Sequence, residues 1–219
     1  MTKSCSLTLI LLVVYQLTFG QTWYKQNLID IAKVSFPEKP VRQDTLNSHF
    51  FKYKSDSALY YIQINPIPDS SLDLNNKETL ERYYEGMTGG IIESSKGTLI
   101  SQKNVKIDGL DAMLIEFSSN AHPNLPNLRF NQIVMIGNTL VSQGYWTDST
   151  LKTNTELDRK FFFESLSITK EGLAQKKQAT QNDSPAYKIG YLCGQLTMFA
   201  LLGLGIYFVI KKVTRKNGS

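Results

Sequence analysis

The sequence predicts an α+β domain, an antiparallel sheet with helices packed on its faces in α/β/α layers, followed by one C-terminal transmembrane helix. Three observations lead to this prediction. Strand-like segments follow one another between residues 31 and 146, and the periodicity changes to helical spacing in 75–95 and again in 155–168. The order shows no βαβ alternation, which favours an antiparallel sheet and excludes a Rossmann-like nucleotide site. A run of 22 uncharged, mostly apolar residues, 189–210, lies near the C-terminus.

The composition is that of a folded protein, and the excess of basic residues lies near the ends of the chain. Hydrophobic residues make up 42% of the 219 residues, which is enough for a packed core. The formal net charge is +5, but residues 21–187 hold all 19 acidic residues and only 18 of the 24 basic ones. The net positive charge therefore comes from residues that flank the two apolar runs, and it indicates how the chain is oriented in a membrane. We accordingly expect no nucleic-acid partner.

Residues 1–20 have the features of a secretory signal peptide. Lys3 precedes an apolar stretch, 7–14, and Gly20 is a small residue at a suitable position for cleavage. A membrane-anchored N-terminus is the alternative, but 7–19 holds only 13 residues. A spanning helix needs about 20 residues, so cleavage after Gly20 is the better prediction.

The run 189–210 is predicted to be a single membrane-spanning helix. At about 1.5 Å per residue its length reaches about 33 Å, which exceeds the hydrocarbon core of about 30 Å. A polar linker, 171–188, precedes it, and a basic tail, 211–219, follows it. Basic residues favour the cytoplasmic side. The tail is therefore expected in the cytoplasm and the domain, 21–170, outside it, in the periplasm or the extracellular space.

Cysteine use agrees with an exported domain that has no disulfide. Cys5 lies in the predicted signal peptide and Cys193 in the predicted anchor, so residues 21–170 hold none. The domain must therefore hold itself together by its core. This pattern favours a protein of the bacterial cell envelope.

The first predicted elements of the domain are strands. The segment 31–36 ends at Pro37, which cannot donate to a ladder. Segments 48–55 and 58–67 flank a polar turn and predict a hairpin. In 58–67 both alternating sets of residues are largely apolar, which is typical of a central strand covered on both faces.

A helix, two further hairpins and a second helix are predicted after these strands. The helix lies in 75–95. The hairpins are 103–119, which turns at Asp108 and Gly109, and 128–146. The loop between the two hairpins holds two prolines.

The second helix begins near Thr155 and contains three consecutive phenylalanines. Leu157 and Phe161 share a stripe at helical spacing, with Phe162 near it. We expect these aromatic side chains to clamp the helix onto the sheet. A short terminal strand, 166–168, is expected to follow.

The sequence resembles the PsbP-like fold, which includes the photosystem subunit PsbP and the Ran release factor. The resemblance rests on "KVSFPEKPVRQ" (33–43), "VKIDGLDAMLIEF" (105–117) and "FFFESLSI" (161–168), with paired aromatic strands and a glycine-bearing helix between them. It covers most of 23–170 and implies an antiparallel sheet of about seven strands with helices on its faces. Members of this superfamily usually bind or assemble with other proteins, and the resemblance supplies no active-site residues.

No constellation for catalysis or for a metal or cofactor is evident in the sequence. His49 and His122 are the only histidines, and no G-x-S-x-G, C-x-x-C or H-E-x-x-H motif occurs. The acidic residues Asp108, Asp111 and Glu116 belong to one hairpin, where Asp108 serves the turn and the other two point to opposite faces. We expect a protein that is not an enzyme and has no cofactor.

The proline loop 118–129 is the candidate binding site, because long surface loops often carry function. A solvated connector between the hairpins is the alternative. The candidate residues of this loop are His122, Pro123, Asn124, Pro126 and Arg129.

A second candidate interface lies on the predicted anchor. Gly190, Cys193, Gly194 and Thr197 share one helical face, and Gly190 and Gly194 have the spacing that lets two helices approach closely in lipid. We expect this face to pair with itself, which gives a homo-oligomer, or with another membrane helix. Glycine is also frequent in spanning helices that do not pair.

Two functional hypotheses follow from the sequence. In the first, the chain is a single-pass membrane protein that presents a non-enzymatic domain for binding a protein or a cell-envelope component. In the second, it is a membrane-tethered enzyme or small-ligand-binding domain. A deep pocket with converging ionisable groups would favour the second.

Overall fold

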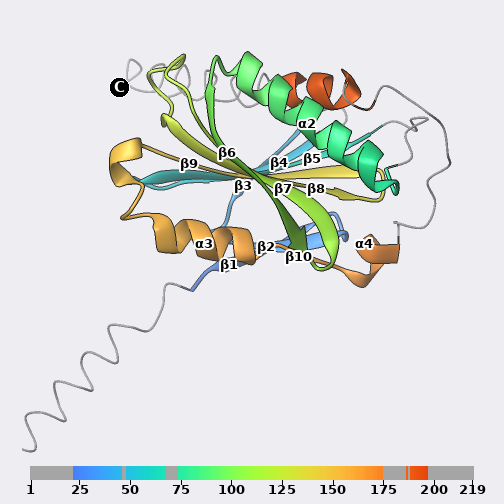
Figure 1. The fold of residues 1–219 in the computed structure, drawn as a ribbon. Coiled ribbons are helices and arrows are strands. Elements are labelled where there is room, and N and C mark those ends of the chain that lie inside the picture. Colours follow the sequence, from blue (N-terminus) through green and yellow to red (C-terminus); the bar gives the residue numbers. More distant parts are fainter. Residues whose placement is uncertain (1–21, 46–47, 68–73, 175–185, 187, 197–219) are drawn as a thin grey trace, which may run out of the picture.

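The computed structural model describes residues 22–45, 48–67, 74–174, 186 and 188–196. Its centre is a seven-stranded antiparallel sheet in the order β3-β4-β5-β9-β8-β7-β6 (Figure 1). The strands are β3 (Val41–Thr45), β4 (Ser48–Lys54), β5 (Ala58–Pro66), β6 (Thr98–Ile107), β7 (Leu110–Ser118), β8 (Leu128–Ile136) and β9 (Thr139–Thr147). The prediction of an α+β fold with an antiparallel sheet and helices is therefore confirmed.

One face of the sheet is covered by α2 (Lys77–Ser94) and by a C-terminal helical segment, residues 188–196, which lies beside α2 (Figure 1). The opposite face carries a second, three-stranded sheet in the order β1-β2-β10 together with α3 (Figure 1). The elements of this layer are β1 (Tyr24–Leu28), β2 (Ala32–Phe36), α3 (Glu156–Glu164) and β10 (Ser167–Ile168), with η1 (Ser149–Leu151) before α3 and α4 (Lys170–Ala174) after β10.

The turn predicted at Asp108 and Gly109 joins β6 to β7, and both residues have positive φ angles, 47° and 84°. Glycine adopts such angles without strain. The Asp108 carboxylate also accepts a hydrogen bond of 2.7 Å from the backbone N–H of Ile168. One turn residue therefore fixes the hairpin and holds the terminal strand β10, a second role that the sequence did not indicate.

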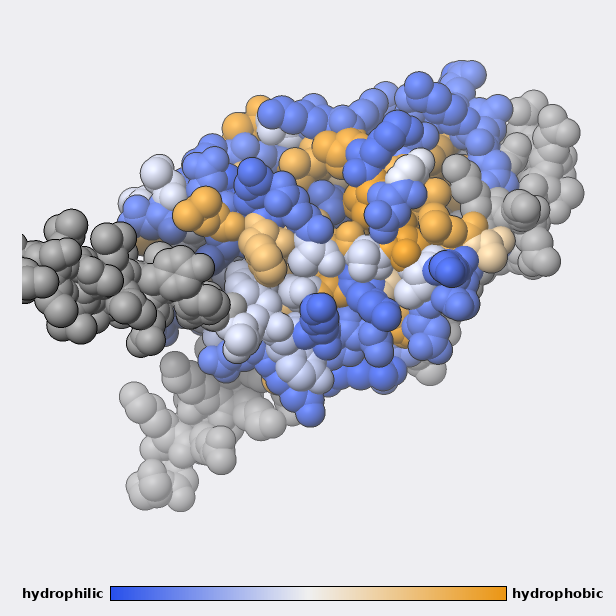
Figure 2. All heavy atoms as spheres, turned by 90° about the horizontal axis from the view of Figure 1, so that it is seen from below, coloured by the Kyte–Doolittle hydropathy of each residue, from blue (hydrophilic) through white to orange (hydrophobic). Residues whose placement is uncertain are grey.

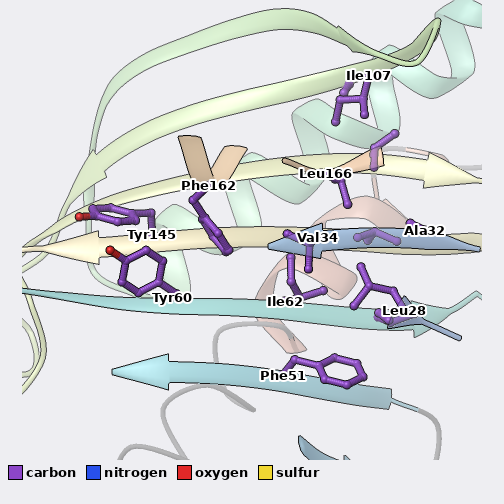
Figure 3. Packing of buried hydrophobic residues seen from close by; sticks show 14 of the residues in the cluster. Leu28, Ala32, Val34, Phe51, Tyr60, Ile62, Ile107, Tyr145, Phe162 and Leu166 are labelled. Carbon is purple, nitrogen blue, oxygen red and sulfur yellow. The ribbon is translucent and has the colours of Figure 1, made fainter. Parts of the chain in front are cut away.

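The core between the seven-stranded sheet and the second sheet is aromatic. Phe162 is fully buried and lies 5.2 Å from the ring of Tyr60 and 5.4 Å from that of Phe36. Figure 3 shows Phe162 pointing between the strands that carry Tyr60 and Tyr145. Burying a phenylalanine of this size stabilises the fold by about 2–3 kcal/mol. Phe162 is thus the residue that clamps α3 onto the sheet.

The stripe predicted on α3 is therefore wrong in its orientation. Leu157 is 81% exposed and Phe161 is 47% exposed. The helix turns Phe162 inward, and Phe161 instead contacts the ring of Trp23 at 4.6 Å, near the start of the described chain. Figure 2 views the molecule from this side and shows apolar residues among hydrophilic ones.

Helix α2 begins where the sequence predicts. The Asn76 side chain caps it by accepting a hydrogen bond of 3.1 Å from the Thr79 N–H. The buried side of α2 then packs on the sheet through Tyr84. The Tyr84 hydroxyl donates to the Asp111 carbonyl and accepts from the Met135 N–H, both at 2.9 Å. The paired register of β7 with β8 stops at Ala112 and Val134, so this hydroxyl bridges the two strands just beyond the end of their ladder.

We predict that Tyr84→Phe lowers the free energy of unfolding by about 2 kcal/mol, because it leaves a buried N–H and a carbonyl without their partner. Chemical denaturation of the full chain in detergent measures this. The control is Tyr24→Phe, since Tyr24 lies on the exposed edge of β1. Equal unfolding midpoints for the two variants would show that the bridge adds nothing.

Candidate functional site

Polar side chains are buried on the α2 face of the three central strands β5, β9 and β8. The register places Arg129 opposite Trp146, and Asn131 opposite Gly144, which in turn lies opposite Tyr61. Side chains on adjacent strands in such register stand on the same face. We call this group the polar strip. Its members, each at most 2% exposed, are Tyr61, Gln63, Arg129, Asn131, Ser142 and Trp146.

The middle of the polar strip depends on a glycine. The Tyr61 ring lies directly over Gly144, where a Cβ atom would overlap the ring carbons. This position lets the Tyr61 hydroxyl cross β9 and donate a hydrogen bond of 2.8 Å to Asn131 Oδ1. The Trp146 indole N–H lies 3.4 Å from the same oxygen. Burial raises the pKa of Tyr61 well above its usual value, so the hydroxyl keeps its proton at neutral pH.

Arg129, at one end of the polar strip, is a buried cation that has no anionic partner among the described residues. Its side chain is 0% exposed. Its Nε donates to the Pro126 carbonyl at 3.2 Å, and its guanidinium lies 4.4 Å from the centre of the Trp146 ring. In the part of the chain that the structure describes, neither Nη1 nor Nη2 has a hydrogen-bond partner.

The charge of Arg129 persists in this environment. Burial lowers the pKa of Arg129 to about 10, which still leaves the guanidinium protonated at pH 7. A desolvated cation–π contact contributes about 2 kcal/mol, and one hydrogen bond of a charged group about 1.5–3 kcal/mol. Burying an unpaired ion costs several kcal/mol even after relaxation. These contacts offset that cost at least in part, and Nη1 and Nη2 remain donors without a hydrogen-bond partner among the described residues.

The predicted binding loop contacts this arginine through the Pro126 carbonyl. Pro123 and Asn124 are exposed, while His122 and Pro126 are partly buried. The loop is fastened at both ends, since Ser119 Oγ donates to the Ser95 carbonyl at the end of α2 and Pro126 accepts from Arg129. The structure thus brings the loop and Arg129 together, but Arg129 is fully buried and not on the surface.

Sequence reasoning missed the remaining members of the polar strip. Asn131, Ser142 and Tyr61 lie on strands predicted as hairpin arms and carry no motif. The one signal available was "RFNQ" (129–132), in which polar residues stand at both alternating positions of an otherwise apolar strand. In a strand that is buried on both faces, such residues need partners inside the protein.

The other candidates are accounted for by surface interactions. His49 lies 2.9 Å from Asp44, and the guanidinium of Arg42 beside that carboxylate lowers the pKa of Asp44. Asp111 pairs with Lys106 at 2.8 Å, and Glu116 pairs with Lys152 at 2.6 Å. Within the described ranges, no three His, Cys, Asp or Glu side chains are grouped so that they could hold a metal ion.

The face predicted for helix pairing lies against α2. A Cβ on Gly190 would overlap the Tyr83 carbonyl, and one on Gly194 would overlap the Met87 carbonyl. Cys193 packs partly buried in the same cluster, and Thr197 lies outside the described residues. So do the predicted signal peptide, the basic tail and residues 197–210. Among the helices that the structure describes, none is long and apolar enough to cross a bilayer.

Comparison with solved structures finds similar folds. Cyanobacterial PsbP (CyanoP) from Synechocystis is 13% identical, with a TM-score of 0.48 over 69% of this chain and 96% of that one. A protein of unknown function from Pseudomonas aeruginosa is 9% identical, with a TM-score of 0.39 over 74% and 99% of the two chains. A protein from Bacteroides thetaiotaomicron is 13% identical, with a TM-score of 0.30, and the match spans 64% of this chain but only 46% of that one.

The chain is therefore structurally similar to PsbP, whose fold its sequence resembles. At these identities the likeness concerns the fold alone, and no site residue is transferred from it. Comparison with protein-family models gives no match, and comparison with curated proteins gives no significant relative.

We predict that Gly144→Ala destabilises the protein by about 3 kcal/mol, because the added methyl group pushes Tyr61 out of its place over β9. The control is Thr139→Ala at the partly exposed first residue of the same strand. It removes a side chain away from Tyr61 and should be nearly neutral. Urea unfolding followed by tryptophan fluorescence compares the two, and a Gly144→Ala variant as stable as the parent would contradict the close approach.

Proposed function

We propose that this protein is a membrane-tethered, non-enzymatic binding protein whose exported domain holds an anionic group of a protein or cell-envelope component on Arg129. The observation that carries the proposal is the buried guanidinium with both Nη nitrogens unpaired in the described structure. A guanidinium presents its donors as a planar fork, which matches a carboxylate or a phosphate with two parallel hydrogen bonds.

The surroundings of Arg129 support such a role. Trp146 and Phe117 place aromatic rings 4.4 and 5.9 Å from the guanidinium carbon, which fixes its plane. Asn131, two residues further along β8 on the same face, adds an unpaired Nδ2 donor. Access requires that the loop 119–127 lift, and this breaks the hydrogen bond between Arg129 and Pro126. The bound anion then takes the place of the Pro126 carbonyl as the hydrogen-bond acceptor of Arg129, and this new acceptor carries a negative charge.

The tether is the sequence-based part of the proposal. Residues 1–20 export the chain, 189–210 anchor it, and the four cations in 211–216 hold the C-terminus in the cytoplasm. The domain then meets its partner in the periplasm or outside the cell. In this arrangement the 18-residue linker, 171–188, limits how far Arg129 can lie from the membrane surface.

A second candidate function is the binding of a small anionic ligand. The full burial of Arg129 favours it, because a small anion needs less movement of the loop than a macromolecule does. The two functions differ in whether a free anion is enough for binding.

We predict that inorganic phosphate or citrate raises the melting temperature of the full chain and that Arg129→Met abolishes this rise. Ligands that bind only the folded state stabilise it by mass action. Without anion, Arg129→Met should be no less stable than the parent, because replacing an uncompensated charge with an apolar chain is often neutral or stabilising.

The matched control is Arg42→Met, an exposed arginine on the edge strand β3, which should respond to anions as the parent does. The anion site is refuted if the parent and Arg129→Met respond alike. A large rise in the melting temperature of the parent with free citrate would favour the binding of a small ligand over the binding of a macromolecule.

We predict that a reporter fused after Ser219 is active only in the cytoplasm and that added protease digests the domain in right-side-out vesicles. The reason is the cluster of cations after residue 210. Replacing Lys211 and Lys212 by glutamine should weaken the orientation. If the domain is protected from protease in right-side-out vesicles, the proposed membrane anchor and its orientation are wrong.

A further inference from the structure

The close contact between α2 and the C-terminal helical segment involves the same residues that the predicted anchor needs. Three glycines make it possible. Gly190 and Gly194 lie against the Tyr83 and Met87 carbonyls, and Gly90 of α2 lies against the Tyr191 carbonyl. A Cβ at any of the three positions would overlap the opposing backbone, so the two helices touch along their backbones, as small residues allow.

In this position the segment carries apolar side chains on both its buried and its exposed side. Ala186 is buried, and Ile189 and Cys193 pack against the cluster under α2. On the opposite side, Leu192 is 56% exposed and Leu196 is 65% exposed. Gln195 donates a hydrogen bond of 3.2 Å to the Tyr191 hydroxyl one turn earlier. Its amide therefore has a partner within its own helix, whether or not α2 is present.

The docked position and a membrane-spanning position exclude one another. If residues 188–196 stay on α2, the apolar run has 14 residues left, 197–210. As a helix these reach about 21 Å, short of the hydrocarbon core of about 30 Å. Alternatively, α2 could enter the bilayer together with residues 188–196. This is excluded, because α2 carries the charged residues Glu78, Glu85 and Glu93.

We propose that residues 188–196 exchange between two partners, the Gly90 face of α2 and the lipid bilayer. This inference rests on the anchor of the proposed function. On α2, the segment shields its small-residue face and leaves Leu192 and Leu196 in water. In the bilayer, both leucines enter hydrocarbon and the Gly90 face of α2 becomes free. The domain thus holds the first half of its own anchor until the anchor inserts.

The test uses the exposure of Leu196. In the full chain carrying Cys193→Ser and Leu196→Cys, a membrane-impermeant maleimide labels the docked state in right-side-out vesicles, and the inserted state is protected until detergent is added. Gly90→Leu changes only the domain, yet it should lower the docked-to-inserted ratio roughly tenfold, since a side chain forced into a packed contact is strongly disfavoured. Gly194→Ile should do the same from the other helix.

Glu85→Leu is the control, because it places the same side chain at an exposed position of α2, and it should label as the parent does. Labelling that is equal in the parent, Gly90→Leu and Gly194→Ile overturns the exchange. Carbonate extraction of the same samples reports on the anchor separately. Because the docked state cannot span the bilayer, carbonate should release the docked fraction and retain the inserted one. Complete release of the parent and of every variant refutes the tether, whereas a retained chain with unchanged labelling refutes the exchange alone.

Discussion

The structure depends on covering both faces of the three central strands β5, β9 and β8. All residues of β8 are buried, and β9 is buried except at its first residue. Each face therefore needs its own layer. The second sheet with Phe162 of α3 covers one face with an aromatic core, and α2 covers the other (Figure 1). The chain order meets this demand by placing α2 between β5 and β6 and α3 after β9.

The two faces differ in chemistry, and this difference points to function. On the α3 face the polar groups of the central strands find partners, as when Gln143 donates to the Phe162 carbonyl at 2.6 Å. On the α2 face the polar strip leaves Arg129, Asn131 and Ser142 with unpaired atoms in the described structure. Buried polar groups are normally hydrogen-bonded, so these exceptions among the described residues are the observation on which the proposed anion site rests.

The sequence predicted those parts of the fold whose signals are local. The two apolar sets of 58–67 predicted the central strand β5, and Asp108 and Gly109 predicted the turn between β6 and β7. The polar edge strand β3 (Val41–Thr45) was not predicted, because "VRQDT" has little apolar character. It exists through pairing with β4. The inward turn of Phe162 depends on the second sheet, which no local pattern specifies.

The candidate sites were predicted in part for the same reason. The proline loop and Arg129 were chosen from composition. The predicted hairpin already pairs Arg129 with Trp146 on the neighbouring strand β9, but the burial of Arg129 depends on the layer that covers this face, which no local pattern specifies. The small-residue face of the predicted anchor was visible from spacing. Its partner in the structure is α2 of the same chain, which the sequence could not indicate, since Gly90 is more than 90 residues away.

The central claim is that Arg129 is a charged, unpaired group that takes up an anion. Side-chain nitrogen NMR of the full chain in detergent tests it most directly, with the Arg129 signal identified by its loss in Arg129→Met. On titration with inorganic phosphate at pH 7, the account predicts a saturable shift of the Arg129 Nη signals, because two charge-assisted hydrogen bonds form there. Arg129 signals that stay unchanged while those of exposed arginines shift weakly and without saturation would contradict the account.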